Sequence, residues 1–148
     1  MQHSKMSVIR SALLFLFLSA CSSQVKTLTT SMEEVWIPME DGVVLAADLY
    51  FPKAPAVGSR HPVLLEYLPY RKDESRARNA ELYSYFLERG YIVARVDIRG
   101  TGNSGGKTIP YEYSEIELAD GETVVDWLSR QPWSSGSVGM FGISWGGF

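Results

Sequence analysis

The chain has 148 residues, with 14 Lys and Arg against 17 Asp and Glu, so its formal net charge at pH 7 is −3. This slightly acidic balance leaves no basic patch and excludes a nucleic-acid partner. The single cysteine, Cys21, excludes an intramolecular disulfide and a thiolate metal cluster, and we expect no metal or organic cofactor.

The first 20 residues have the composition of a bacterial signal peptide. Lys5 and Arg10 supply a positive region, and the apolar run over residues 12–18 is too short to span a bilayer. Small residues then precede Cys21. This pattern resembles the lipobox, in which the cysteine is lipidated and becomes the first residue of the mature protein. It predicts a protein of the bacterial cell envelope, held at the periplasmic or outer-membrane face by a lipid on Cys21. The alternative is a secretory signal with an incidental cysteine.

The remaining chain divides into a tether and one domain. Residues 21–32 are polar and rich in hydroxyl groups, which is typical of a flexible tether. Residues 33–148 contain no internal repeat or low-complexity tract, and we treat them as one partial catalytic domain. Loss of residues 1–20 would change the net charge from −3 to −5.

Short apolar runs bounded by turn residues predict the strands of this domain. Strands are expected over residues 33–38, 43–51, 62–67, 91–97 and 138–141. The first two flank the turn signal Glu40-Asp41-Gly42 and should form an antiparallel hairpin.

Apolar stripes at helical spacing predict two helices between the later strands. The first stripe contains Leu82, Tyr83, Phe86 and Leu87, with Asn79 as a candidate cap and Gly90 as the stop; the second contains Ile116, Ala119, Val124, Trp127 and Leu128, and Pro132 ends it. Alternation of strands and helices indicates an α/β fold whose mostly parallel sheet is covered on both faces.

The sequence Gly142-Ile143-Ser144-Trp145-Gly146 directly follows the last predicted strand. A serine at the tip of a tight strand-to-helix turn is exposed at the carboxyl end of the sheet, and glycines two residues to either side avoid clashes in that turn. The backbone N–H of Trp145 could then stabilise an oxyanion. A glycine-rich turn without chemistry is the alternative; the preceding strand and Gly147 favour the nucleophile elbow.

Residues 33–148 resemble the cocaine-esterase (CocE/NonD) and X-Pro dipeptidyl-peptidase family of α/β-hydrolases, in motifs that occur in the family's order. The similar segments are the hairpin 39–50, the loop 68–73, the strand and glycine-rich loop 89–106, Gln131-Pro132-Trp133 and the elbow region 139–148. The resemblance implies the amino-terminal part of an α/β-hydrolase fold.

The resemblance also implies roles for three residues. Ser144 matches the nucleophile, Trp145 provides one oxyanion donor through its backbone N–H, and Tyr70 provides the other through its phenolic O–H. From the residues alone, an ordinary surface tyrosine is the favoured interpretation of Tyr70. For Asp97, Arg99 and the loop 100–106 we expect a structural role in ion pairs and tight turns. The glycines of that loop match a dinucleotide fingerprint, but no acidic residue follows at the required distance.

A catalytic serine needs a base, and the sequence offers two histidines. His3 lies in the signal segment, and His61 precedes a strand, at the edge of the sheet opposite the elbow. In α/β-hydrolases the acid and the histidine follow the serine, whereas the sequence continues only to Phe148. We therefore expect a fragment truncated just after the elbow, inactive by itself, with an exposed and unpaired elbow strand.

These features favour a membrane-anchored serine hydrolase that cleaves an ester or amide through an acyl-enzyme on Ser144. The expected partner is a small-molecule or peptide substrate, and peptide, ester and β-lactam-type amide substrates all remain open. One alternative is a surface lipoprotein that keeps the fold as a non-catalytic binding module. A second alternative is a truncated product without function.

Overall fold

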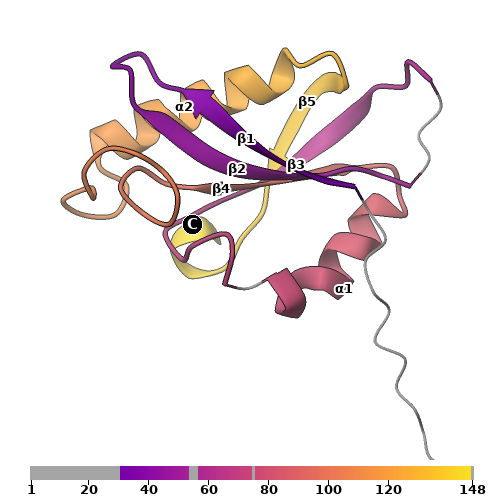
Figure 1. Cartoon of the computed structure of the whole chain (residues 1–148), viewed down its shortest axis with the longest axis horizontal. Helices are drawn as coiled ribbons and strands as arrows, with labels where there is room; N and C mark the ends of the chain where they lie inside the picture. The colour runs from indigo at the N-terminus through magenta and orange to yellow at the C-terminus, as the bar shows by residue number, and fades with distance from the viewer. Residues whose placement is uncertain (1–30, 54–56, 75, 148) are drawn as a thin grey trace, which may run out of the picture.

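The computed structural model describes residues 31–53, 57–74 and 76–147, which form one open five-stranded sheet with the order β1-β2-β4-β3-β5 (Figure 1). The strands are β1 (Met32–Pro38), β2 (Val44–Tyr50), β3 (His61–Leu68), β4 (Ile92–Asp97) and β5 (Ser134–Met140). Strand β2 is antiparallel to β1 and β4, whereas β3 is parallel to β4 and β5. The opening hairpin and the mostly parallel sheet of an α/β fold are thus confirmed.

One helix covers each face of the sheet: α1 (Arg76–Leu87) lies below it and α2 (Glu115–Ser129) lies above it in the view of Figure 1. Val124 and Leu128 of α2 belong to the main apolar core. Tyr83 and Leu87 of α1 form a second cluster with Tyr50 and Val93 of the sheet. Because helices cover both faces, all six residues of β4 are buried, as in a central parallel strand.

The first helix differs from its prediction at its amino end. It begins at Arg76, so Asn79 lies inside the helix, where its amide donates to the Tyr83 hydroxyl at 3.4 Å. The expected cap at Asn79 was therefore wrong. Leu82 of the predicted stripe is exposed, because the helix turns Tyr83 and Leu87 towards the sheet. The helix ends before Gly90, whose φ of 82° suits glycine.

The second helix buries acidic residues where an apolar stripe was expected. Ile116 and Ala119 are exposed, while Glu117 and Asp120 are buried. The two carboxylates face inward because each accepts hydrogen bonds, Glu117 from the elbow and Asp120 from Arg99. The prediction holds for the later turns of α2, where Val124 and Leu128 are buried.

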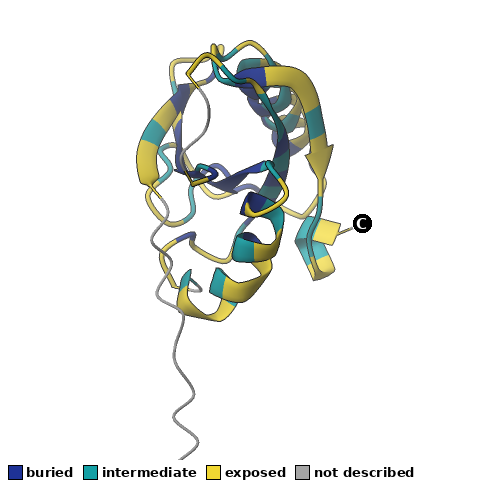
Figure 2. Ribbon diagram, turned by 90° about the vertical axis from the view of Figure 1, so that its right-hand side faces the viewer, coloured by how far each residue is buried: buried dark blue, intermediate teal, exposed yellow. Residues whose placement is uncertain are grey.

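Strand β5 lies at the edge of the described sheet, where it pairs with β3. Five of its seven residues are exposed, and Figure 2 shows this strand in yellow leading into the short helix η1 (Ser144–Gly147). Within the described residues β5 is thus an exposed edge strand, but its exposed residues are mostly serine and glycine, whereas an apolar edge was expected.

The sheet starts slightly before the expected domain boundary. Ser31 accepts a hydrogen bond from the Phe51 backbone, and Met32 pairs with Tyr50 in β1, although both residues were assigned to the tether. Residues 1–20, for which the sequence predicts a signal peptide, and Cys21 lie outside the described residues. In the part of the chain that the structure describes, no helix combines the length and apolar character needed to cross a membrane.

Candidate active site

Three loops of the predicted site meet at one edge of the sheet, because β3, β4 and β5 run in parallel and their carboxyl ends coincide. Tyr70 follows β3, the glycine-rich loop 100–106 follows β4, and Ser144 follows β5. This edge therefore brings together candidate residues from three separate segments of the sequence.

The turn that carries Ser144 has the backbone geometry of a nucleophile elbow. Ser144 is exposed and has a φ of 58°, a left-handed conformation that is costly for a residue with a side chain. A Cβ on Gly142 would collide with the carbonyl of Gly146, and one on Gly147 would collide with the carbonyl of Gly142. The glycines around Ser144 are thus required by the close approach of backbone within the turn.

Trp145 and Tyr70 lie next to each other although 75 positions separate them in the sequence. The Trp145 backbone N–H donates to the Tyr70 hydroxyl oxygen at 3.2 Å. This bond uses the phenol oxygen as an acceptor, and the O–H of Tyr70 can still donate elsewhere. The Tyr70 side chain is 46% exposed, so both groups face the accessible edge of the sheet.

Glu117 and Tyr113, which the sequence did not indicate as site residues, contact Trp145 from the side of α2. Glu117 accepts a hydrogen bond from the indole Nε1–H at 2.7 Å, and the Tyr113 hydroxyl donates to the Trp145 carbonyl at 2.8 Å. The backbone N–H of Tyr113 donates to the second carboxylate oxygen of Glu117 at 2.7 Å. These side chains line a cavity of about 730 Å³ between α2 and β5.

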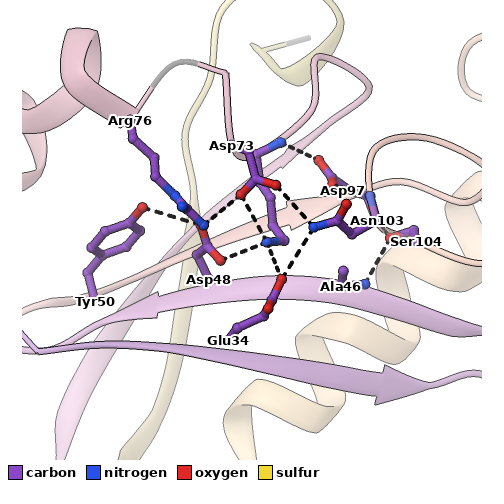
Figure 3. Close-up of polar contacts among 10 residues, drawn as sticks. Glu34, Ala46, Asp48, Tyr50, Asp73, Arg76, Asp97, Asn103 and Ser104 are labelled. Atoms are coloured by element: carbon purple, nitrogen blue, oxygen red, sulfur yellow. Dashed lines mark hydrogen bonds and ion pairs between the residues drawn. The ribbon is translucent and has the colours of Figure 1, made fainter.

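A buried ion network fixes the loop that carries Tyr70 (Figure 3). The fully buried Lys72 ammonium donates to Glu34 of β1 at 2.6 Å and to Asp48 of β2 at 2.9 Å, and it contacts Asp73 at 3.3 Å. Burial alone would lower the pKa of Lys72, but the hydrogen bonds to these carboxylates outweigh it and raise the pKa. Lys72 therefore remains charged and joins its loop to two strands.

Asp97 joins the same loop to the glycine-rich loop. Its carboxylate accepts hydrogen bonds from the backbone N–H groups of Lys72 at 2.5 Å and Asn103 at 3.0 Å. A Cβ on Gly102 would collide with this carboxylate, which explains the glycine at φ 51°. Burial raises the pKa of Asp97 despite these bonds.

Arg99 has the structural role that the sequence predicted for it. Its guanidinium contacts Asp120 of α2 at 2.7 Å and Asp41 of the hairpin turn at 2.6 Å. These bonds to the two carboxylates raise the pKa of Arg99. Asp97 and Arg99 thus support the turns beneath the site, as expected.

His61 lies at the opposite edge of the sheet, where β3 begins. Its Nδ1 is 2.7 Å from the Gly90 carbonyl oxygen, and its Nε2 is 2.9 Å from the Ser59 hydroxyl. The seven residue steps of β3 place it about 23 Å from Leu68, at the edge of the sheet where the elbow lies. Within residues 31–53, 57–74 and 76–147, no group of His, Cys, Asp and Glu is arranged to hold a metal ion.

The protein has an α/β-hydrolase fold. Strand β5 leads into a strained serine turn that requires glycines, and helices cover both faces of the sheet. Solved structures agree with this assignment. A CocE/NonD family hydrolase from Staphylococcus aureus superposes with a TM-score of 0.67 at 23% identity, over 79% of this chain and 24% of that one. An α-amino acid ester hydrolase superposes with a TM-score of 0.64 at 30% identity, over 79% and 22%.

Sequence comparison identifies the family. The family of X-Pro dipeptidyl-peptidases (S15 family) matches residues 41–148, and the chain belongs to this family. Cocaine esterase from Rhodococcus sp. (strain MB1 Bresler) is 40% identical over 113 residues, which are 75% of this chain and 19% of that protein. The chain thus spans about a fifth of the length of this curated relative.

Proposed function

We propose that the protein is a serine hydrolase that cleaves an ester or an amide through an acyl-enzyme on Ser144. Membership in a family that includes X-Pro dipeptidyl-peptidases, and similarity to a cocaine esterase, support an ester or peptide substrate. The observation that carries the proposal is the 3.2 Å contact between the Trp145 N–H and the Tyr70 hydroxyl, directly after the strained Ser144.

In the proposed reaction the Ser144 Oγ attacks the substrate carbonyl carbon while a base takes its proton. The carbonyl oxygen becomes an oxyanion that accepts a hydrogen bond from the Tyr70 O–H and one from the Trp145 N–H, which exchanges the Tyr70 oxygen for the oxyanion as its acceptor. The tetrahedral intermediate expels an alcohol or amine, which receives the proton from the base. Water then attacks the acyl-enzyme, releases the acid and restores the Ser144 hydroxyl.

The base in this proposal is a histidine outside the described residues. His61 is excluded by its place at the amino end of β3 and by its contacts with Gly90 and Ser59. We place the acid and the histidine after Ser144 in sequence, as is the order in α/β-hydrolases. The 148-residue chain by itself is then catalytically inactive.

Replacing Tyr70 tests the proposed oxyanion site. In the complete gene product, Tyr70→Phe should lower kcat for an activated ester by about 10²–10³-fold, because one of two oxyanion donors is lost. The side chain is exposed, so removal of its hydroxyl should leave the unfolding midpoint unchanged. Tyr111→Phe, at another exposed tyrosine, is the matched control and should retain kcat. A Tyr70→Phe variant with normal kcat would show that Tyr70 is not an oxyanion donor.

We further propose that a lipid on Cys21 anchors the protein to the cell envelope, on the strength of the signal-like segment before it. In a bacterial host, Cys21→Ser should abolish incorporation of labelled fatty acid and shift the protein from the membrane fraction to the soluble periplasmic fraction. Ser22→Ala at the next residue is the control and should leave both unchanged. Membrane association that persists in Cys21→Ser, without label, would contradict the anchor.

A further inference from the structure

The residue after the proposed nucleophile is held by more contacts than a surface turn requires. Besides the bond from its N–H to Tyr70, Trp145 donates its indole N–H to Glu117 and accepts a hydrogen bond at its carbonyl from Tyr113. The ring of Tyr113 also lies against the indole, with ring centroids 6.5 Å apart. The backbone N–H, the carbonyl and the side chain of Trp145 are thus each oriented by a different partner.

Glu117 connects these contacts. It is 4% exposed and lies in the first turn of α2, where the positive end of the helix dipole favours a carboxylate. One oxygen accepts from Trp145 and the other accepts from the Tyr113 backbone, each at 2.7 Å. The Tyr67 hydroxyl donates to the Glu117 carbonyl at 3.3 Å, which ties this turn of the helix to β3. Glu117 therefore has a fixed position relative to the sheet and to the elbow.

We propose that Glu117 is a positioning residue that aims the Trp145 backbone N–H at the oxyanion, an inference that rests on the proposed function. An oxyanion donor is effective only within a narrow range of distance and direction. The elbow helix η1 has only four residues, so it contains few hydrogen bonds of its own to fix the orientation of Trp145. The buried carboxylate supplies that orientation through the indole.

A purely structural role for Glu117 makes a different prediction. A glutamate in the first turn can reach back to a backbone N–H and cap its helix, and the bond from Tyr113 resembles such a cap. In that case the bond to Trp145 would have no effect on the reaction, and losing it would alter stability alone. The two roles are separated by kinetics that isolate the bond between Glu117 and Trp145.

A double-mutant cycle on the complete gene product, with an activated ester as substrate, makes this separation. Glu117→Gln keeps the shape of the side chain but turns an amide N–H₂ towards one of the two N–H donors. Trp145→Phe removes the indole N–H and keeps the backbone N–H. We expect each variant to lower kcat by about 10-fold or more, short of the loss of a whole donor, with KM within about twofold. The double variant should be no slower than the slower single variant.

If the fold reductions in kcat caused by Glu117→Gln and Trp145→Phe multiply in the double variant, the proposal is overturned. A normal kcat in a folded Glu117→Gln variant would overturn it as well. If Glu117→Gln does not fold, Trp145→Phe decides alone, because a normal kcat in that variant also overturns the proposal. Glu122→Gln, at an exposed position of the same helix, is the matched control and should leave kcat unchanged. The Ser144→Ala variant is measured in the same assay. If it retains activity, the proposed function itself is refuted. If it loses activity while Glu117→Gln has a normal kcat, only the role of Glu117 is refuted.

Discussion

Residues 21–148, purified alone, should hydrolyse p-nitrophenyl acetate no faster than their Ser144→Ala version. A serine hydroxyl is protonated near neutral pH and needs a base within hydrogen-bond reach. The histidine that the structure describes, His61, lies at the other end of β3, about 23 Å along the strand, and contacts Gly90 and Ser59. Relative to the complete gene product, we expect kcat to fall by about 10⁶-fold, as it does when a triad loses its base.

The measurement is the initial rate of p-nitrophenol release at several enzyme concentrations, with circular dichroism to verify that both versions are folded. His61→Gln is a useful companion, because it should leave the low rate unchanged. Turnover that rises with enzyme concentration and vanishes with Ser144→Ala would contradict the prediction and require another base near the elbow.

Replacing Lys72 should have the largest effect on stability. Lys72→Met removes the only positive charge in direct contact with Glu34 among the described residues. It leaves the buried Asp48 with Arg76 and the Tyr50 hydroxyl as its partners. Removing one partner of a buried ion pair costs about 3–5 kcal/mol when the remaining charge has no other partner. Since Arg76 still contacts Asp48, the lower end of this range applies here. We expect a loss of this size in the free energy of unfolding, measured by urea titration of the gene product.

Lys107→Met is the matched control, since Lys107 is exposed and its substitution should change the free energy of unfolding by no more than about 0.5 kcal/mol. The two variants change net charge equally, so the difference between them reports the buried network. Equal stabilities would show that the contacts of Lys72 with Glu34 and Asp48 contribute nothing net. Because Tyr70 is two residues away, Lys72→Met should also lower kcat if the variant folds.

The sequence predicted those parts of the fold that depend on local apolar pattern. Continuous runs such as residues 91–97 predicted buried strands because a sheet covered on both faces needs apolar residues throughout. The elbow was visible because the close backbone approaches that require Gly142 and Gly147 lie within one short segment of the sequence. Tyr70, by contrast, was selected through resemblance to a family, since its partner Trp145 is 75 positions away.

The sequence did not predict that Lys72 is buried and paired. Lys72 stands between Arg71 and Asp73, and such a run is usually a solvated surface. Its partners Glu34 and Asp48 are 38 and 24 residues distant, so only the folded sheet brings them together. Glu117 was missed for the same reason.

The central claim, that Ser144 is the nucleophile, is tested most directly by covalent labelling of the complete gene product. A fluorophosphonate probe reacts with an activated serine, and mass spectrometry of the digested protein locates the adduct. We predict one adduct, on the peptide that contains Ser144, and no adduct in the Ser144→Ala variant. Ester hydrolysis by a protein whose Ser144 stays unlabelled, or an adduct that persists in Ser144→Ala, would contradict the account.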